Sequence, residues 1–171
     1  SRVSAVYDAA PRKSFVAALK DIPEIWEISY DPTIEPIYNG MVHDYKMGEG
    51  IAIPGFLNPR RTYLATVMDD FFFDSSYAHV MGASRTGQGQ VVHLDVRKKI
   101  ADLDIPGMPH LGSGITWSRN GRTVMASPNL KDGLVSVVDM TDWNVIKQIP
   151  TLGPGFFMRS HGNTPYAWVD S

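Results

Sequence analysis

Two stretches decide the fold: Phe72-Phe-Asp-Ser-Ser-Tyr-Ala-His-Val-Met-Gly-Ala-Ser84 and Ile115-Thr-Trp-Ser-Arg-Asn-Gly-Arg-Thr-Val-Met-Ala-Ser127. They align without a gap over 13 positions, at an offset of 43 residues. Both continue through a short polar turn into a further strand-like run, Val91–Val96 in one copy and Val135–Met140 in the other, where the aspartates correspond at an offset of 44. A repeat of this length with four short strands is typical of a β-propeller blade. The alternative is a chance likeness between two β-meanders.

The repeat extends in both directions from these two copies. A third copy begins at Phe156 and stops at Ser171, part-way through a unit. Toward the N-terminus, Phe15–Leu19 and Glu24–Tyr30 are strand-like runs that fit the middle pair of strands and are predicted to form a hairpin. Between them and the first full copy, residues 32–68 carry several prolines and glycines without a sustained period, which predicts an irregular insertion.

The fold class is therefore all-β, with blades of four antiparallel strands and about four blades in residues 1–171. The chain is long enough for one domain with its own hydrophobic core. Propellers close with typically 4–8 blades, and both ends of this chain fall inside a unit. We therefore expect residues 1–171 to be part of a larger propeller domain, with the insertion at 32–68.

Composition excludes several classes of function. A formal net charge of −2 argues against nucleic acid as a partner, because phosphates require a basic face. The absence of cysteine excludes disulfides, thiolate metal sites and covalent haem attachment through a C-x-x-C-H motif. No apolar run is long enough for a membrane-spanning helix, and no signal peptide is visible at Ser1, which says little if Ser1 is not the natural start. No phosphate-binding glycine loop, G-x-S-x-G or H-E-x-x-H motif is present.

Two similar phrases each place one histidine in a connection rich in glycine and proline. His110 lies in Met108–Gly114 and His161 lies in Met158–Pro165, 51 positions later. If neighbouring blades bring them to one mouth of the channel, the pair could ligate a metal or exchange protons with a substrate. The alternative is that each histidine only bonds a loop carbonyl. His79 and His93 lie inside strand patterns, which favours an ordinary surface or core role.

Several arginines could serve a ligand that carries carboxylates, because the guanidinium fork bonds a carboxylate at two points. The candidates are Arg60 and Arg61 in the insertion, Arg85 at a strand end, and Arg159 near His161. A solvated surface role is favoured for the other arginines, Arg97, Arg119 and Arg122. Aromatic side chains could stack on a flat ligand, although aromatics at alternate strand positions are more often core. They are Trp117, Phe156, Phe157 and Trp168.

The two histidine phrases resemble a known family. Met-Pro-His110-Leu-Gly-Ser-Gly and Met-Arg-Ser-His161-x-Asn-x-x-Tyr-x-x-Val-Asp are similar to the two histidine segments of the haem d1 domain of cytochrome cd1 nitrite reductase. Phe15–Lys20 and Glu24–Tyr30 resemble its preceding blade. The resemblance implies an eight-bladed propeller in which His110 and His161 lie on the distal side of the haem and supply protons. The proximal iron ligand of the reductase belongs to an earlier part of the propeller, so no metal ligand is expected here.

The insertion departs from the reductase pattern. Val42–Asp44, Pro54–Arg61 and Asp69–Asp74 resemble instead the haem d1 biosynthesis branch of the family, the NirF proteins. This implies a role in late haem d1 maturation, in the periplasm or tethered to the membrane that faces it. The implied ligand is haem d1 or its dihydro precursor, whose peripheral carboxylates give the arginines a role. The implied ligand-binding residues are His43, Arg60, Arg61, Arg85 and Arg159.

The implied partners are other haem d1 maturation proteins and cd1 nitrite reductase, with a homodimer left open. Whether the protein is an oxidoreductase acting on the precursor or a carrier also stays open. The alternatives are the haem d1 domain of the reductase itself, the dihydro-haem d1 dehydrogenase branch (NirN), and a propeller that only binds other proteins.

Overall fold

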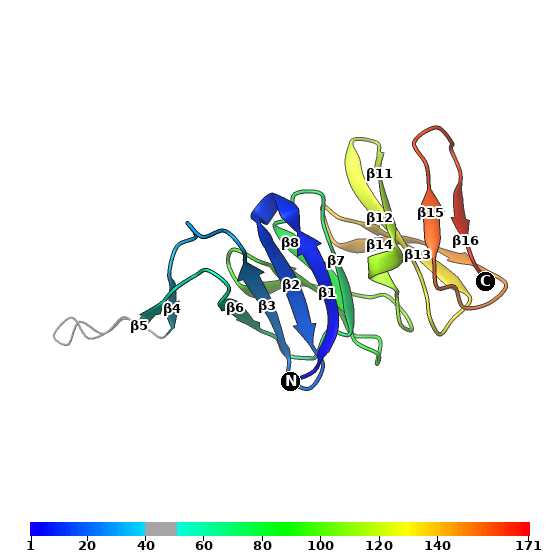
Figure 1. Cartoon of the computed structure of the whole chain (residues 1–171). Helices are drawn as coiled ribbons and strands as arrows, with labels where there is room; N and C mark the ends of the chain where they lie inside the picture. The colour runs from blue at the N-terminus through cyan, green and yellow to red at the C-terminus, as the bar shows by residue number, and fades with distance from the viewer. Residues whose placement is uncertain (40–50) are drawn as a thin grey trace.

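The computed structural model describes residues 1–39 and 51–171, and it contains three four-stranded antiparallel sheets followed by a two-stranded one (Figure 1). The first sheet has the order β1-β2-β3-β6, formed by Val3–Ala9, Ser14–Leu19, Glu24–Ser29 and Pro59–Tyr63. The second has the order β10-β9-β8-β7, formed by Lys98–Leu103, Gly89–His93, His79–Ala83 and Asp70–Phe73. The third has the order β11-β12-β13-β14, formed by Ile115–Arg119, Arg122–Pro128, Leu134–Asp139 and Asn144–Pro150. The last sheet pairs β15 (Met158–Ser160) with β16 (Ala167–Val169).

This arrangement confirms the predicted fold class. Each four-stranded sheet is one blade, and the repeat at an offset of 43 superimposes β8 on β12. The predicted hairpin is β2–β3, with Ser14 opposite Ser29. The last two strands, β15 and β16, occupy the place of the first two strands of a fourth blade.

The first strand of each blade lies beside the first strand of the next. β1 contacts β7, and β11 contacts β15. These inner strands all run in the same direction, so the molecule has two distinct ends. We call the end where the chain passes from one blade to the next the connection end (residues 64–69, 104–114 and 151–157), and the other the hairpin end (residues 10–13, 74–78, 120–121 and 161–166). In Figure 1 the β11–β12 and β15–β16 turns both lie at the upper, hairpin end, and the short helix before β11 lies near the other.

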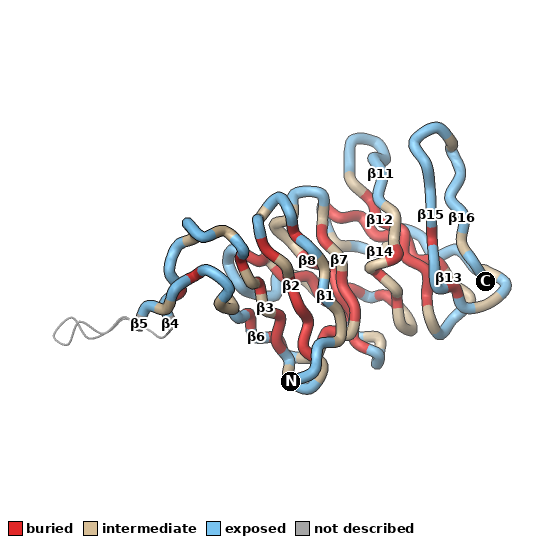
Figure 2. The backbone as a smooth tube through the Cα atoms, viewed as in Figure 1, coloured by how far each residue is buried: buried red, intermediate tan, exposed pale blue. Residues whose placement is uncertain are grey.

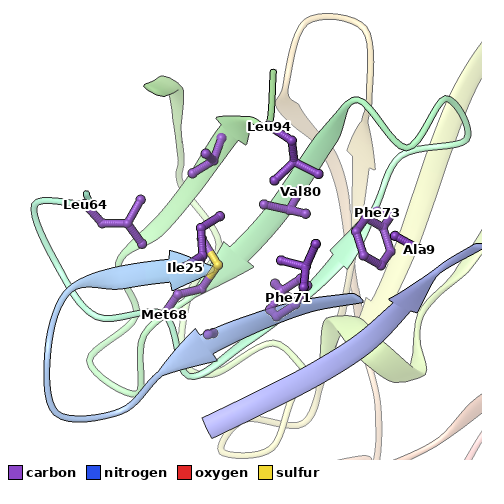
Figure 3. Packing of buried hydrophobic residues seen from close by; sticks show 11 residues of the cluster. Ala9, Ile25, Leu64, Met68, Phe71, Phe73, Val80 and Leu94 are labelled. Carbon is purple, nitrogen blue, oxygen red and sulfur yellow. The ribbon is translucent and has the colours of Figure 1, made fainter. Parts of the chain in front are cut away.

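The core lies between the faces of successive blades. Central strands are buried over most of their length, while turns are exposed (Figure 2). Between the first and second blades, Ile25 and Met68 pack with Phe71 and Val80 (Figure 3). A second cluster around Met81 and Met125 joins the second and third blades. Burying such apolar faces provides roughly 25 cal/mol per Å² removed from water. Neighbouring blades therefore stabilise one another.

An ion pair between partly buried Arg12 and exposed Asp95 also joins the first two blades. Arg12 lies in η1 (Ala10–Arg12), at the hairpin end of the first blade. It donates at two points to Glu27, 2.7 and 3.0 Å, and at 2.6 Å to Asp95 of the second blade. Burial alone would lower the pKa of Arg12, but the bonds to Glu27 and Asp95 raise it above the ordinary value. The Arg12 guanidinium is therefore engaged in structural hydrogen bonds.

The insertion at 32–68 is partly regular, which differs from the prediction. β6 lies inside it and pairs with β3 as the outermost strand of the first blade. A short hairpin of β4 (Ile37–Asn39) and β5 (Ile51–Ile53) fills part of the connection between β3 and β6. The predicted site residue His43 lies outside the described residues. Over the described part of the chain, no helix has the length and apolar character needed to cross a membrane.

Candidate functional site

His110 lies at the connection end, between β10 and the short helix η2 (Leu111–Ser113). Its backbone N–H donates to the carbonyl of Pro128, 2.9 Å away. Its ring Nδ1 lies 2.6 Å from the carbonyl oxygen of Phe156. A carbonyl only accepts hydrogen bonds, so Nδ1 must carry the hydrogen and the neutral ring presents Nε2 as a lone pair. The loop-carbonyl contact considered from sequence is therefore present, and it leaves Nε2 able to accept a proton.

Two exposed aromatic rings adjoin His110. Phe156 and Phe157 are each 51% exposed, and their ring centroids lie 4.9 Å apart. The centroid of the His110 ring lies 4.7 Å from that of Phe156. The Arg159 guanidinium lies over the Phe157 ring, 5.8 Å from its centroid. These four residues, which we call the His110 patch, combine stacking surface, a cation and a proton acceptor.

Asp170 holds the phenylalanine pair in place. Its Oδ1 accepts the backbone N–H groups of both Phe156 and Phe157, each at 2.7 Å. The backbone N–H of Asp170 in turn donates to the Phe157 carbonyl, 3.2 Å away. The bond from Phe157, and with it the one from Phe156, outweigh burial and lower the pKa of Asp170 below its ordinary value. The carboxylate is thus fixed as an acceptor for the backbone.

Buried Asn129, at the start of the β12–β13 turn, fixes the segment that precedes His110. Its side-chain Oδ1 accepts from the backbone N–H of Met108 at 3.2 Å and of Lys131 at 2.9 Å. Its Nδ2 donates to the carbonyl of Pro106, 2.6 Å away. At 1% exposure it has little access to water, so these bonds satisfy its polar atoms and order the loop.

Asp70 and Tyr7 fix the segment that follows His110. Oδ1 of Asp70 accepts the Tyr7 hydroxyl at 2.7 Å, and Oδ2 accepts the backbone N–H of Gly112 at 3.0 Å. Burial, followed by the bond to Asp70, raises the pKa of Tyr7 well above its ordinary value, so the phenol stays protonated and donates. A Cβ at Gly112 would lie 1.9 Å from the Tyr7 hydroxyl oxygen, so any larger residue would have to displace the Tyr7 phenol. Ser113 completes the attachment by accepting the backbone N–H of Met158 of the last sheet at 3.0 Å.

His161 lies in the β15–β16 turn, at the hairpin end. Its Nδ1 accepts the backbone N–H of Asn163, 3.2 Å away. It lines a groove of about 750 Å³ between the third blade and the last hairpin, with Trp117 and Tyr166. The chain advances five residues from Phe156 to His161, about 16 Å at the spacing of a β-strand. His110 thus lies in a blade connection and His161 in a strand turn, and their pairing at one site stays a prediction.

The two arginines of the insertion lie on β6, the outermost strand of the first blade. Arg61 donates at two points to Glu24, 2.8 and 2.7 Å, and its guanidinium lies 5.2 Å from the centroid of the Tyr63 ring. Arg60 donates to the carbonyl of Glu35, 2.7 Å away. Both arginines therefore lie on the outer edge of the first sheet, and the inner strand β1 forms its other edge. The structure does not place them with His110.

Arg85 lies at the connection end, in the β8–β9 turn. Its Nε lies 3.1 Å from Oδ1 of Asp69, and its carbonyl accepts Nζ of Lys131 from the third blade. Asp69 and Asp70 point to different partners, as expected for adjacent strand residues. Arg85 therefore lies at the same end of the molecule as the His110 patch, which includes Arg159.

His79 and His93 lie opposite one another on β8 and β9, with ring centroids 4.6 Å apart. Nδ1 of His79 bonds Asp74 at 3.1 Å. Nδ1 of His93 accepts the backbone N–H of Asp95 at 3.3 Å, so its hydrogen lies on Nε2 and that nitrogen cannot ligate a metal in this state. Within residues 1–39 and 51–171, no group of three or more metal-ligating side chains occurs.

Sequence reasoning missed four residues that build the site: Tyr7, Asp70, Asn129 and Asp170. Tyr7 and Asp70 are 63 residues apart, and no local pattern announces their contact. The sequence did contain a signal for Asp170, because this residue is the last one of the second histidine phrase, which ends in Val-Asp. Phe156 and Phe157 are both half exposed, which favours the stacking alternative over the core one.

Comparison with known proteins confirms the resemblance to the haem d1 domain family, and the NirF branch stays a prediction. The Cytochrome D1 heme domain family matches residues 1–171. The dihydro-heme d1 dehydrogenase of Pseudomonas aeruginosa is 45% identical over 172 aligned positions, which cover 100% of this chain and 31% of that protein. The chain thus spans about a third of this relative's length.

Solved structures show the same fold. Dihydro-heme d1 dehydrogenase NirN in complex with DHE has 45% identity and a TM-score of 0.81, covering 99% of this chain and 32% of that one. Hydrazine synthase of Kuenenia stuttgartiensis, at 7% identity, has a TM-score of 0.59 over 85% of this chain and 35% of that one. The RRP9 WD40 repeats, at 10% identity, have a TM-score of 0.56 over 91% of this chain and 41% of that one. These last two are similar in fold alone. From its three repeated blades and a match over its whole length, the chain belongs to the Cytochrome D1 heme domain family.

Proposed function

We propose that this chain contributes the His110 patch to a binding site for a d1-type tetrapyrrole, and that the full-length protein is a dehydrogenase of a dihydro-haem d1 precursor. The observation that carries this proposal is the 45% identity to a dihydro-heme d1 dehydrogenase along the whole chain. The His110 patch supports it, because its exposed rings suit a flat macrocycle and Arg159 suits a peripheral carboxylate.

His110 is the residue that we assign to proton transfer. Dehydrogenation removes hydrogen as protons and electrons, so it needs a base near the reacting carbon and an oxidant for the electrons. Nε2 of His110 is a free lone pair when the ring is neutral, because Nδ1 is occupied by the Phe156 carbonyl. His110 thereby supplies the base, and Arg159 orients the ligand.

A NirF-type biosynthesis protein, enzyme or carrier, is the second candidate. The insertion segments Pro54–Arg61 and Asp69–Asp74 favour it by their resemblance to that branch. The insertion also lies within the range of the dehydrogenase match, so it does not separate the two branches. Under either candidate we propose a periplasmic or membrane-tethered location facing the periplasm, with haem d1 maturation proteins and cd1 nitrite reductase as partners.

The haem d1 domain of the reductase itself and a ligand-free interaction scaffold are the remaining readings. A single titration separates the scaffold from the rest. Haem d1 is added to the full-length protein and followed by visible absorption, beside His110→Ala and the matched control His161→Ala. We expect His110→Ala to change the bound spectrum and weaken binding about tenfold or more, as for loss of a hydrogen bond to a buried ligand, and His161→Ala to match the wild type.

Turnover of the dihydro precursor with an added electron acceptor then separates the dehydrogenase from the carrier. Absence of binding, or an unchanged spectrum in His110→Ala, would reject the proposed site. Binding without turnover would reject the dehydrogenase and leave the carrier.

A further inference from the structure

One peptide group lies between Asp170 and His110. The carbonyl of Phe156 and the N–H of Phe157 are the two ends of the same planar peptide unit. The carbonyl end accepts from Nδ1 of His110 at 2.6 Å, and the N–H end donates to Oδ1 of Asp170 at 2.7 Å. The carboxylate and the imidazole are therefore joined through a single rigid dipole, without touching one another.

This arrangement strengthens the bond to His110. A hydrogen bond to a carboxylate is charge-assisted and short, and it polarises the peptide that donates it. A polarised peptide has a more negative carbonyl oxygen, and cooperative strengthening is estimated at perhaps 10–30% per bond. The Phe156 carbonyl is thus a better acceptor for Nδ1–H of His110 than an unassisted carbonyl would be.

The backbone around this peptide group leaves it little freedom. Asp170 also accepts the N–H of Phe156 at 2.7 Å, and its own N–H donates to the Phe157 carbonyl. A Cβ at Gly155 would lie 2.5 Å from the carbonyl oxygen of Asp170, so the two chain segments approach closely. Arg159, the other charged side chain of the patch, donates to the Met158 carbonyl at 2.6 Å. The orientation of the 156–157 peptide therefore depends on the Asp170 carboxylate.

We propose that Asp170 is a positioning residue for His110, and that it acts through the 156–157 peptide to keep the ring hydrogen on Nδ1 and the lone pair on Nε2. In free histidine the neutral ring prefers the opposite tautomer, with hydrogen on Nε2, so the protein must impose this one. In other sites, the hydrogen bond to one ring nitrogen of a functional histidine fixes the tautomer and orientation of the ring. The consequence for catalysis rests on the proposed function, whereas the tautomer itself does not.

The test is the nitrogen chemical shifts of the His110 ring. Full-length, ligand-free protein is labelled with ¹⁵N-histidine and measured at about pH 9, above the ordinary range for imidazole. His110→Gln assigns the signals. Asp170→Ala removes the acceptor, Asp170→Asn keeps an oxygen but removes the charge, and Asp21→Asn is the matched control because Asp21 also accepts a backbone N–H, that of Arg2.

We expect the wild type and the control to show hydrogen on Nδ1, Asp170→Ala to shift toward the Nε2–H tautomer, and Asp170→Asn to lie between them. Thermal unfolding of each variant checks that it is folded. Nδ1–H tautomers of equal population in the wild type and Asp170→Ala would overturn the proposal, and so would a wild type with hydrogen on Nε2.

Kinetics with the dihydro precursor provide the second arm. If His110 is the base, Asp170→Ala lowers kcat about tenfold, with little change in KM. This is the lower limit typical of replacing a residue that orients a functional histidine. A tautomer shift in a protein that shows no turnover in the wild type would support the positioning role and reject the dehydrogenase. Turnover that is equal in the wild type and Asp170→Ala would overturn the positioning role while leaving the dehydrogenase intact.

Discussion

Several aspartates in this chain serve the backbone. Asp31 accepts the N–H of Thr33 at 2.9 Å, and Asp139 accepts that of Thr141 at 2.8 Å. Asp170 does the same for the phenylalanine pair at the site. A carboxylate that accepts N–H groups is stabilised in its charged form, which lowers its pKa. Protonation of these carboxylates at acid pH therefore weakens the local structure that they stabilise.

Asp31 is the clearest case for a pH measurement. The Lys13 ammonium, then the N–H and hydroxyl of Thr33, lower the pKa of Asp31 to about 2. Because the folded pKa is below the unfolded one, near 3.9, the contribution to stability is complete above that unfolded value. It is lost as the pH falls through about 2.

We therefore expect Asp31→Asn to reduce the pH dependence of the unfolding free energy between about pH 4 and 2. At neutral pH the variant should be slightly less stable. Urea unfolding across this range measures both effects, and Lys13→Met should give a smaller change of the same sign. An unchanged pH dependence in Asp31→Asn would show that the Asp31 contacts add nothing to stability in solution.

At the residue scale, sequence could identify His110 but not its environment. The Met-Pro-His phrase marks a histidine in a connection, whereas the Phe156 carbonyl that sets its tautomer is 46 residues away. The expected pairing of His110 with His161 stays a prediction, because the two histidines lie in different kinds of turn and the register of the last unit cannot be read from the sequence. Asp95 and Asp139 are equivalent in the repeat, yet one binds Arg12 of another blade and the other Arg122 of its own.

At the scale of elements, the strands that repeat were predictable and those that do not were missed. The hairpin β2–β3 and the blades that contain β8 and β12 follow from apolar runs and a fixed offset. β6 reads as a loop because Pro-Arg-Arg-Thr-Tyr is polar, but an outer strand tolerates both charge and a proline at its first position. β1 was not recognised, because its exposed valines give no clear alternation.

The contact between Tyr7 of β1 and Asp70 of β7 should be measurable as a coupling between elements. We expect a double-mutant cycle with Tyr7→Phe and Asp70→Ala to give a coupling free energy of about 1.5–3 kcal/mol, typical of a hydrogen bond to a charged group. Unfolding by urea measures it. The control pair is Tyr7→Phe with Asp31→Ala, two sites without a shared partner, which should be additive. Additivity in the Tyr7–Asp70 cycle as well would mean that the bond is not formed in solution.

At the scale of the whole molecule, apolar surface gathers at the last sheet. Tyr166 and Trp168 are 69% and 56% exposed, and Tyr166 lines the groove beside the third blade. Within residues 1–39 and 51–171, β16 pairs with β15 alone, and unpaired strand edges promote pairing with other chains. In a complete blade, two further strands would cover this surface.

A polypeptide of residues 1–171 alone should therefore self-associate. We expect light scattering to show a mass above that of the 18.9 kDa chain at micromolar concentration. Tyr166→Lys should reduce association, whereas Tyr38→Lys, at a tyrosine that is 59% exposed on β4, should not. A monomer at all concentrations would contradict this expectation.

The attachments of the His110 loop also bear on how the protein folds. Tyr7 to Asp70, Asp70 to Gly112 and Ser113 to Met158 span 63, 42 and 45 residues of chain. Contacts of such high contact order form late, because each requires a long segment to close first. A nascent chain with one or two finished blades therefore lacks the geometry around His110, and the proposed tetrapyrrole site would form only after the neighbouring blades have stacked.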